Sequence, residues 1–98
     1  MIITNEFNNF VTIRLPAEFN FKLHREFREA YLHRPPGLTY ELDFRDVVAF
    51  DSAAMGMMLL MRNHCGDENA KIHLINFSDK ILKMLEIAHF NIFFIMGK

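Results

Sequence analysis

The stretch from Leu42 to Met61 constrains the fold of this chain more than any other. Residues 47–50 are apolar, the acidic and hydroxyl pair Asp51 and Ser52 follows, and the chain then stays almost wholly apolar to Met61. A short apolar run before such a pair is typical of a buried strand, and the longer run after it is typical of a helix. The stretch therefore predicts a strand that leads directly into a helix N-terminus, a local unit common in α/β proteins.

The rest of the chain alternates between the same two patterns. Strand-like patterns occupy residues 2–4, 10–15, 38–44, 47–50 and 72–77, and residues 92–96 suit either an edge strand or a packed tail. Helical spacing occupies residues 20–34, 52–64 and 78–88, with Asn20 and Ser78 as expected N-caps. We therefore predict an α/β fold in which residues 1–98 form a single small domain. It should hold a central mixed, largely parallel sheet of four to five strands and about three helices.

Composition excludes several classes of protein. Eleven basic and 12 acidic residues give a net charge of -1, so no broad basic field favours a nucleic-acid partner. The apolar runs are too short for membrane insertion, and the N-terminus does not look like a signal peptide. The single Cys65 excludes an internal disulfide and fits a reducing, cytoplasmic location, and the histidines show no metal-ligand spacing. We expect no metal and no cofactor.

Ser52 has two possible roles at its helix N-terminus. Its oxygen can accept a hydrogen bond from a backbone N–H as an N-cap, a contribution worth about 1 kcal/mol. It can also carry a phosphate, because free N–H groups and the helix dipole favour negative charge there. The neighbouring Asp51 could bind a metal together with Asp46, but stabilisation of the loop or of the helix dipole is the simpler interpretation.

The six residues from Asp51 to Gly56 resemble a family motif. An apolar strand ending in Asp, two Ser or Thr positions, a small residue, Leu or Met, and Gly characterise the STAS domain of bacterial anti-sigma factor antagonists. Asp51, Ser52, Ala53, Ala54, Met55 and Gly56 match this pattern everywhere except at the second hydroxyl. Residues 15–21 and 71–87 also resemble segments of that family, so the likeness spans nearly the whole chain.

The resemblance implies a partner switch without catalysis. In the family, the unphosphorylated domain binds a serine kinase or anti-sigma factor, phosphorylation of the second hydroxyl residue breaks the complex, and a serine phosphatase reverses it. The corresponding position here is Ala53, which has no oxygen to modify. Either the natural protein lacks the switch, or a Ser→Ala substitution mimics the unphosphorylated state. Ser52 then corresponds to the first hydroxyl, which we expect to cap the helix rather than to serve as a residual phosphosite.

The motif also predicts a partner-binding surface. We expect Ala54, Met58 and Met61 to face the sheet, and an exposed apolar patch around Ala53, Gly56 and Met57 to meet the partner. The expected partner-binding residues are Asp51, Ser52, Ala53, Ala54, Met55, Gly56 and Met57. Several phenylalanines near the C-terminus leave a homodimer possible.

Two functions fit these features. The first is a non-catalytic, cytoplasmic regulatory protein that binds a serine kinase or anti-sigma partner. The alternative is a STAS-like structural subunit of a transporter ATPase or other multiprotein assembly. An enzyme is disfavoured, because the sequence has no phosphate-binding glycine loop and no legible nucleophile–base pair.

Overall fold

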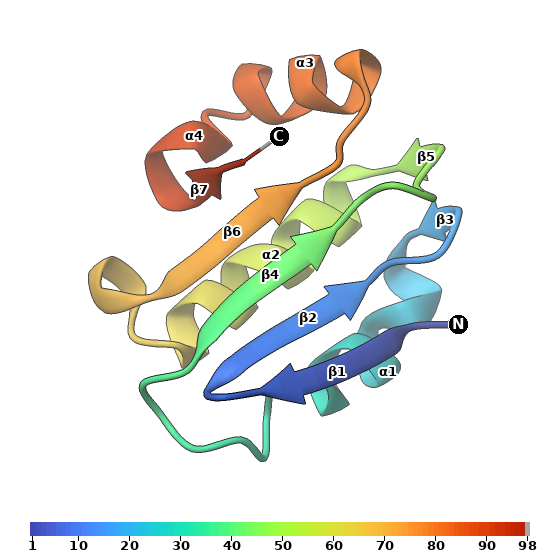
Figure 1. Ribbon diagram of the computed structural model, residues 1–98. Coiled ribbons are helices and arrows are strands. Elements are labelled where there is room, and N and C mark those ends of the chain that lie inside the picture. Colours follow the sequence, from blue (N-terminus) through green and yellow to red (C-terminus); the bar gives the residue numbers. More distant parts are fainter. Residues whose placement is uncertain (98) are drawn as a thin grey trace.

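The predicted mixed sheet is present in the computed structural model, which describes residues 1–97. Five strands lie in the order β1-β2-β4-β6-β7 (Figure 1). β1 (Ile3–Phe7) is antiparallel to β2 (Phe10–Arg14), whereas β4 (Thr39–Asp43), β6 (Lys71–Ile75) and β7 (Ile95–Met96) continue the sheet in parallel. This confirms the predicted fold class; Lys98, the last residue of the predicted domain, lies outside the described residues.

The first hairpin closes through a turn at Asn8 and Asn9. Both asparagines have positive φ, 48° and 64°, as a two-residue hairpin turn requires. The turn pairs Phe7 with Phe10 and sets the register of the whole ladder up to Ile3 opposite Arg14. β1 therefore extends to Phe7, further than the strand predicted over residues 2–4.

A second, two-stranded sheet connects the main sheet to the helices. β3 (Glu18–Phe19) pairs in parallel with β5 (Ala49–Phe50). The rings of Phe19 and Phe50 stack with centroids 5.8 Å apart, which holds the two short strands together. β3 leads towards the first helical segment, and β5 ends directly before the motif.

The helices follow the predicted order. The first helix is shorter than predicted, and a short additional helix follows the last one. α1 (His24–Glu29) follows the 3-10 turn η1 (Phe21–Leu23), and α2 (Ser52–His64) is followed by η2 (Asp67–Asn69). α3 (Asp79–Ile87) precedes α4 (Phe90–Phe93), which replaces the first part of the predicted last segment. The caps at Asn20 and Ser78 are confirmed, since their side chains accept hydrogen bonds from the backbone N–H groups of Lys22 and Ile81.

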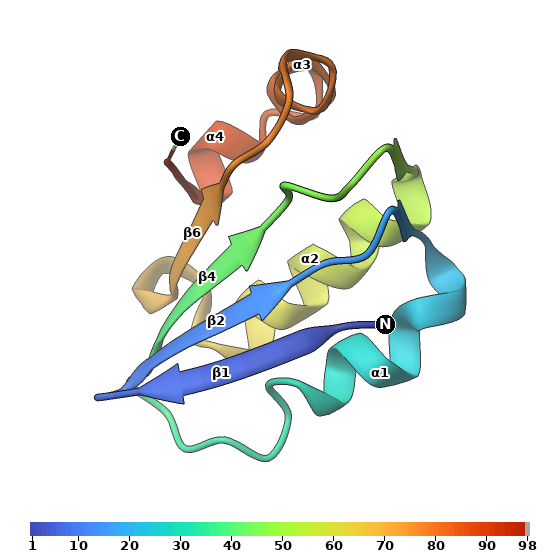
Figure 2. The same cartoon turned by 45° about the vertical axis from the view of Figure 1, so that its right-hand side comes forward.

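One face of the main sheet carries the core. Figures 1 and 2 show α1 and α2 on the same side of the sheet, while α3 and α4 lie at the side of the sheet formed by β6 and β7. The side chains that alternate towards α1 and α2 are fully or almost fully buried: Val11, Ile13, Tyr40, Leu42, Ile72 and Leu74. From α2, Met58 and Met61 are completely buried, as the helical spacing predicted. The N-terminus of α2 thus lies at the carboxyl ends of the parallel strands.

Candidate functional site

Asp51, not Ser52, caps α2. Asp51 has extended backbone geometry (φ -119°, ψ 176°), and its Oδ1 accepts a hydrogen bond of 2.8 Å from the backbone N–H of Ala54. Its carbonyl oxygen also accepts from the N–H of Met55 at 3.1 Å. The prediction that Ser52 is the N-cap is therefore wrong. Asp and Ser are comparably good caps, and the extended chain that leaves β5 places the earlier residue in the capping position.

The corrected cap leaves Ser52 free of a structural role. Ser52 is the first residue of α2 and is exposed, and its hydroxyl makes no hydrogen bond with any described residue. Ala53 next to it is half-buried. A hydroxyl and a methyl group thus occupy the two positions of the motif at an accessible helix N-terminus.

Five of the seven predicted partner-binding residues reach the surface. Asp51, Ser52 and Gly56 are exposed, and Ala53 and Met55 are half-buried. Ala54 is completely buried and Met57 is only 6% exposed, so the prediction that these two contact a partner directly is not supported. Met57 turns away from solvent because α1 packs against α2.

The exposed apolar atoms of α2 lie further along the helix than predicted. Leu59 is 39% exposed and Leu60 67% exposed. Leu60 follows Gly56 by one helical turn, so the two share a face. Val48, which precedes β5, is 66% exposed. The lack of polar residues in α2 before Arg62 was the sequence signal for this surface, but it did not identify the individual side chains.

A groove of about 360 Å³ adjoins the motif. It lies between the β3–β5 pair and α3, and its lining includes Val48, Asp51, Lys80 and Met84. The carboxylate of Asp51 thus joins the wall of a mostly apolar surface depression, although its Oδ1 is already engaged with the helix.

A buried carboxylate near the strand ends, that of Asp43, was not predicted from the sequence. Asp43 is 2% exposed and accepts hydrogen bonds from the backbone N–H and Nε of Arg45 and from Nδ2 of Asn76, at 2.8 to 3.1 Å. Burial alone would raise the pKa of Asp43, but these hydrogen bonds and the Arg45 charge lower it below its ordinary value. Asp43 therefore ties the end of β4 to the end of β6.

Asp46 also forms an ion pair, in this case with Arg14. Its Oδ2 accepts a hydrogen bond of 2.7 Å from Nε of Arg14, and this interaction lowers the pKa of Asp46. Asp46 and Asp51, considered together as possible metal ligands, thus have separate partners. Within residues 1–97, no three His, Cys, Asp or Glu side chains gather closely enough to hold a metal ion. Over the same range, no helix has the length and apolar character needed to cross a membrane.

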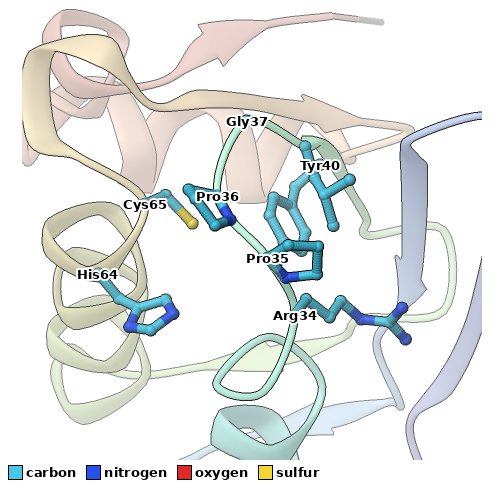
Figure 3. A pocket seen from close by; sticks show the side chains of 8 residues that line it. Arg34, Pro35, Pro36, Gly37, Tyr40, His64 and Cys65 are labelled. Atoms are coloured by element: carbon cyan, nitrogen blue, oxygen red, sulfur yellow. The ribbon is translucent and has the colours of Figure 1, made fainter.

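The only cysteine lies at the opposite end of α2. A pocket of about 160 Å³ separates the helix end at His64 and Cys65 from the turn at Pro35 and Pro36 (Figure 3). Burial raises the pKa of the Cys65 thiol to about 11, and burial likewise raises that of Tyr40 to about 12. A thiol that stays protonated at neutral pH is a poor nucleophile.

Comparison with known proteins agrees with the motif and the fold. The family model described as "Mlab, STAS domain" matches residues 5–96. A STAS-domain containing protein of Pseudomonas aeruginosa (strain UCBPP-PA14) is 41% identical over 83 residues, which cover 82% of this chain and 80% of that protein.

Three solved structures share the fold at low sequence identity. The unphosphorylated anti-sigma factor antagonist SpoIIAA has a TM-score of 0.69 and 17% identity, with 89% of this chain and 83% of that chain covered. The phosphorylated form of SpoIIAA, the Bacillus cell fate determinant, has a TM-score of 0.68 and 16% identity, covering 100% and 92%. The protein TM1081 has a TM-score of 0.80 and 14% identity, covering 100% and 81%. With a matching family model over nearly its whole length, this chain belongs to the STAS domain family.

Proposed function

We propose that this chain is a non-catalytic regulatory protein that binds a cytoplasmic serine kinase or anti-sigma factor through the N-terminal turns of α2. The observation that carries the proposal is the pair Ser52 and Ala53 at an accessible helix N-terminus, with an alanine at the position where the family carries its phosphoacceptor. Without a hydroxyl at that position, the domain stays in its partner-binding state.

The shape of the helix supports protein contact. Gly56 is exposed, and a Cβ built on it would meet no atom within 4 Å, so the backbone of a partner can approach closely. The proposed contact surface is formed by Asp51, Ser52, Ala53, Met55 and Gly56. A phosphate on this surface would add roughly -1.5 to -2 charges beside Asp51, which is the physical basis of a switch that releases the partner.

A phosphorylation assay tests the silenced acceptor. The purified chain, Ala53→Ser and the double variant Ser52→Ala/Ala53→Ser are each incubated with a candidate serine kinase and ATP, and phosphate is located by mass spectrometry. We expect no phosphate on the chain with Ala53 and one phosphate on each variant that carries the introduced hydroxyl. Phosphate on Ser52 of the chain with Ala53 would contradict the assignment of Ala53 as the position of the missing acceptor.

A permanent structural subunit of a transporter ATPase or another assembly is the second candidate. The exposed Leu59 and Leu60 favour it, because large apolar side chains on a helix surface suit lasting contacts, and a domain without an acceptor hydroxyl needs no release. Co-purification distinguishes the two functions. A subunit remains in a stable complex with its ATPase, whereas a regulator is recovered with a kinase and leaves it when the surface is made acidic.

A further inference from the structure

A second groove separates α1 from α2. It has a volume of about 360 Å³, and its apolar lining includes Phe21, Tyr31, Met57 and Leu60. Phe21 and Leu60 are 60% and 67% exposed, so both rise above the nearly buried Tyr31 and Met57. The groove shares only Met57 with the residues expected from the motif, and the proposed function leaves it unexplained.

Arg28 supplies the only fixed charge among the described residues around this groove. Its ionisable rim consists of His24 and Arg28 from α1 and His64 from α2, apart from the phenol of Tyr31, and no carboxylate lines it. Arg28 has no salt bridge within the described residues, in contrast to Arg14 and Arg34. An uncompensated guanidinium beside apolar side chains favours a ligand that offers a carboxylate next to an apolar group.

The residue types match a protein interface rather than an ordinary solvated surface. Phenylalanine, tyrosine, methionine and arginine are enriched at the centres of protein interfaces, whereas lysine, glutamate and aspartate are depleted. Phe21 is also held in place before any partner arrives, because its ring stacks on His24 with centroids 4.6 Å apart and an angle of 7° between the planes. A fixed aromatic side chain loses little conformational entropy on binding.

From these features we infer that the α1–α2 groove binds an amphipathic helix of a partner protein, one that presents leucine-like side chains and carboxylates. The apolar side chains of that helix lie between Phe21 and Leu60, above Met57, and a carboxylate pairs with Arg28. Two helices side by side offer the ridges on which a third helix packs, and helix-in-groove binding uses apolar residues at i, i+3, i+4 and i+7.

A peptide titration tests this inference without knowledge of the natural partner. The probe is a soluble helical peptide with leucines at i, i+3, i+4 and i+7 and glutamates beside them, and its control carries lysines in place of the glutamates. We expect saturable changes of NMR chemical shifts at the groove residues with the glutamate peptide, and binding at least about tenfold weaker with the lysine peptide.

Matched variants localise the binding. Arg28→Glu and Leu60→Gln should each weaken the glutamate peptide at least about tenfold. Their neighbours Arg25→Glu and Leu59→Gln, which change exposed residues outside the groove, should leave it within about twofold, and so should Ala53→Asp. Far-UV circular dichroism confirms that each variant is folded.

Each other outcome overturns the inference. If neither peptide binds, or if both bind equally, the groove does not select an acidic amphipathic helix. If Arg25→Glu weakens binding as much as Arg28→Glu, only general electrostatic attraction operates. If Ala53→Asp alone abolishes binding, the peptide occupies the α2 N-terminus, so the groove inference fails while the proposed function stands.

Discussion

At the scale of single residues, one hydrogen bond decides which of the neighbours Asp51 and Ser52 caps α2. Asp51 accepts a hydrogen bond from the N–H of Ala54 and stabilises the start of α2, while Ser52 is exposed and its hydroxyl takes no part in the cap. Ser52 can therefore be substituted without removing the cap, whereas Asp51 belongs both to the cap and to the proposed contact surface. This difference matters because a variant that merely unfolds the helix start would imitate a loss of binding.

The cap assignment predicts different costs for two adjacent alanine substitutions. Asp51→Ala should lower the free energy of unfolding by about 1 kcal/mol, because the N–H of Ala54 loses its acceptor. Ser52→Ala should change it by less than about 0.5 kcal/mol, because an exposed hydroxyl without a partner is replaced by a good helix former. Chemical denaturation measures both. A larger cost for Ser52→Ala than for Asp51→Ala would show that the serine is the cap after all.

The half-buried thiol of Cys65 predicts low chemical reactivity. With a pKa of about 11 instead of its ordinary value of 9.0, Cys65 carries roughly 100-fold less thiolate at pH 8 than a free cysteine. Its reaction with a disulfide reagent should be correspondingly slow and should keep accelerating above pH 10. A rate that levels off near pH 9 in the folded protein would contradict the effect of burial.

At the scale of elements, α2 contains one glycine in its interior and is followed by another beyond its end. A Cβ added to Gly56 meets nothing within 4 Å, and the residue has ordinary helical geometry, whereas Gly66 has φ +106°. Gly56→Ala should therefore raise the free energy of unfolding by about 0.5–1 kcal/mol. Gly66→Ala should lower it, because an L side chain is strained in the left-handed region. Thermal unfolding of the two variants makes the comparison, and an equal loss in both would contradict it.

Asp43, which links the ends of β4 and β6, predicts a contribution to stability that is lost at acid pH. Asp43 is charged and hydrogen-bonded in the folded state, and its pKa is lowered, so its contribution is complete above the unfolded pKa near 3.9. The contribution disappears as the pH falls through the lower, folded pKa. Asp43→Asn should cost about 1–3 kcal/mol at pH 7, since Arg45 loses its charged acceptor.

The pH dependence of the unfolding free energy is the decisive readout for Asp43. The variant should lose less stability than the natural chain between pH 5 and pH 2. Identical acid branches for the two proteins would show that Asp43 does not carry this linkage.

At the scale of the whole molecule, the spacing of apolar residues along the sequence predicted the strands, helices and buried side chains that depend on local sequence pattern. Alternating apolar residues identified β2, β4 and β6, and helical spacing identified the buried Met58 and Met61. The hexapeptide from Asp51 to Gly56 indicated the family, which the family model confirms.

Features that depend on contacts between distant segments were not predictable in this way. β3 and β5 have two residues each, too few to show a period, and only their pairing defines them. Asn76 reaches Asp43 across 33 positions of sequence. Met57 is covered by α1, which a helical wheel of α2 alone does not show. The choice of Asp51 over Ser52 as cap depends on how β5 delivers the chain, since both residue types cap well.

The fold also separates two surfaces that a partner can use. The N-terminal turns of α2 carry the motif, and the α1–α2 groove begins where Met57 turns away from solvent. A partner that occupies both would contact a single helix along most of its 13 residues. Substitutions in the groove and in the motif should then weaken such a partner independently.

The proposed partner surface on the N-terminal turns of α2 is tested by a calorimetric titration of the partner kinase or anti-sigma factor with three proteins: the unsubstituted chain, Ala53→Asp and Ala70→Asp. Ala70 is half-buried like Ala53 but lies beyond the other end of α2, before β6, so it controls for the added charge. We expect Ala53→Asp to weaken binding at least about tenfold and Ala70→Asp to bind like the unsubstituted chain. Equal binding of all three proteins would contradict the claim that the N-terminal turns of α2 form the partner surface.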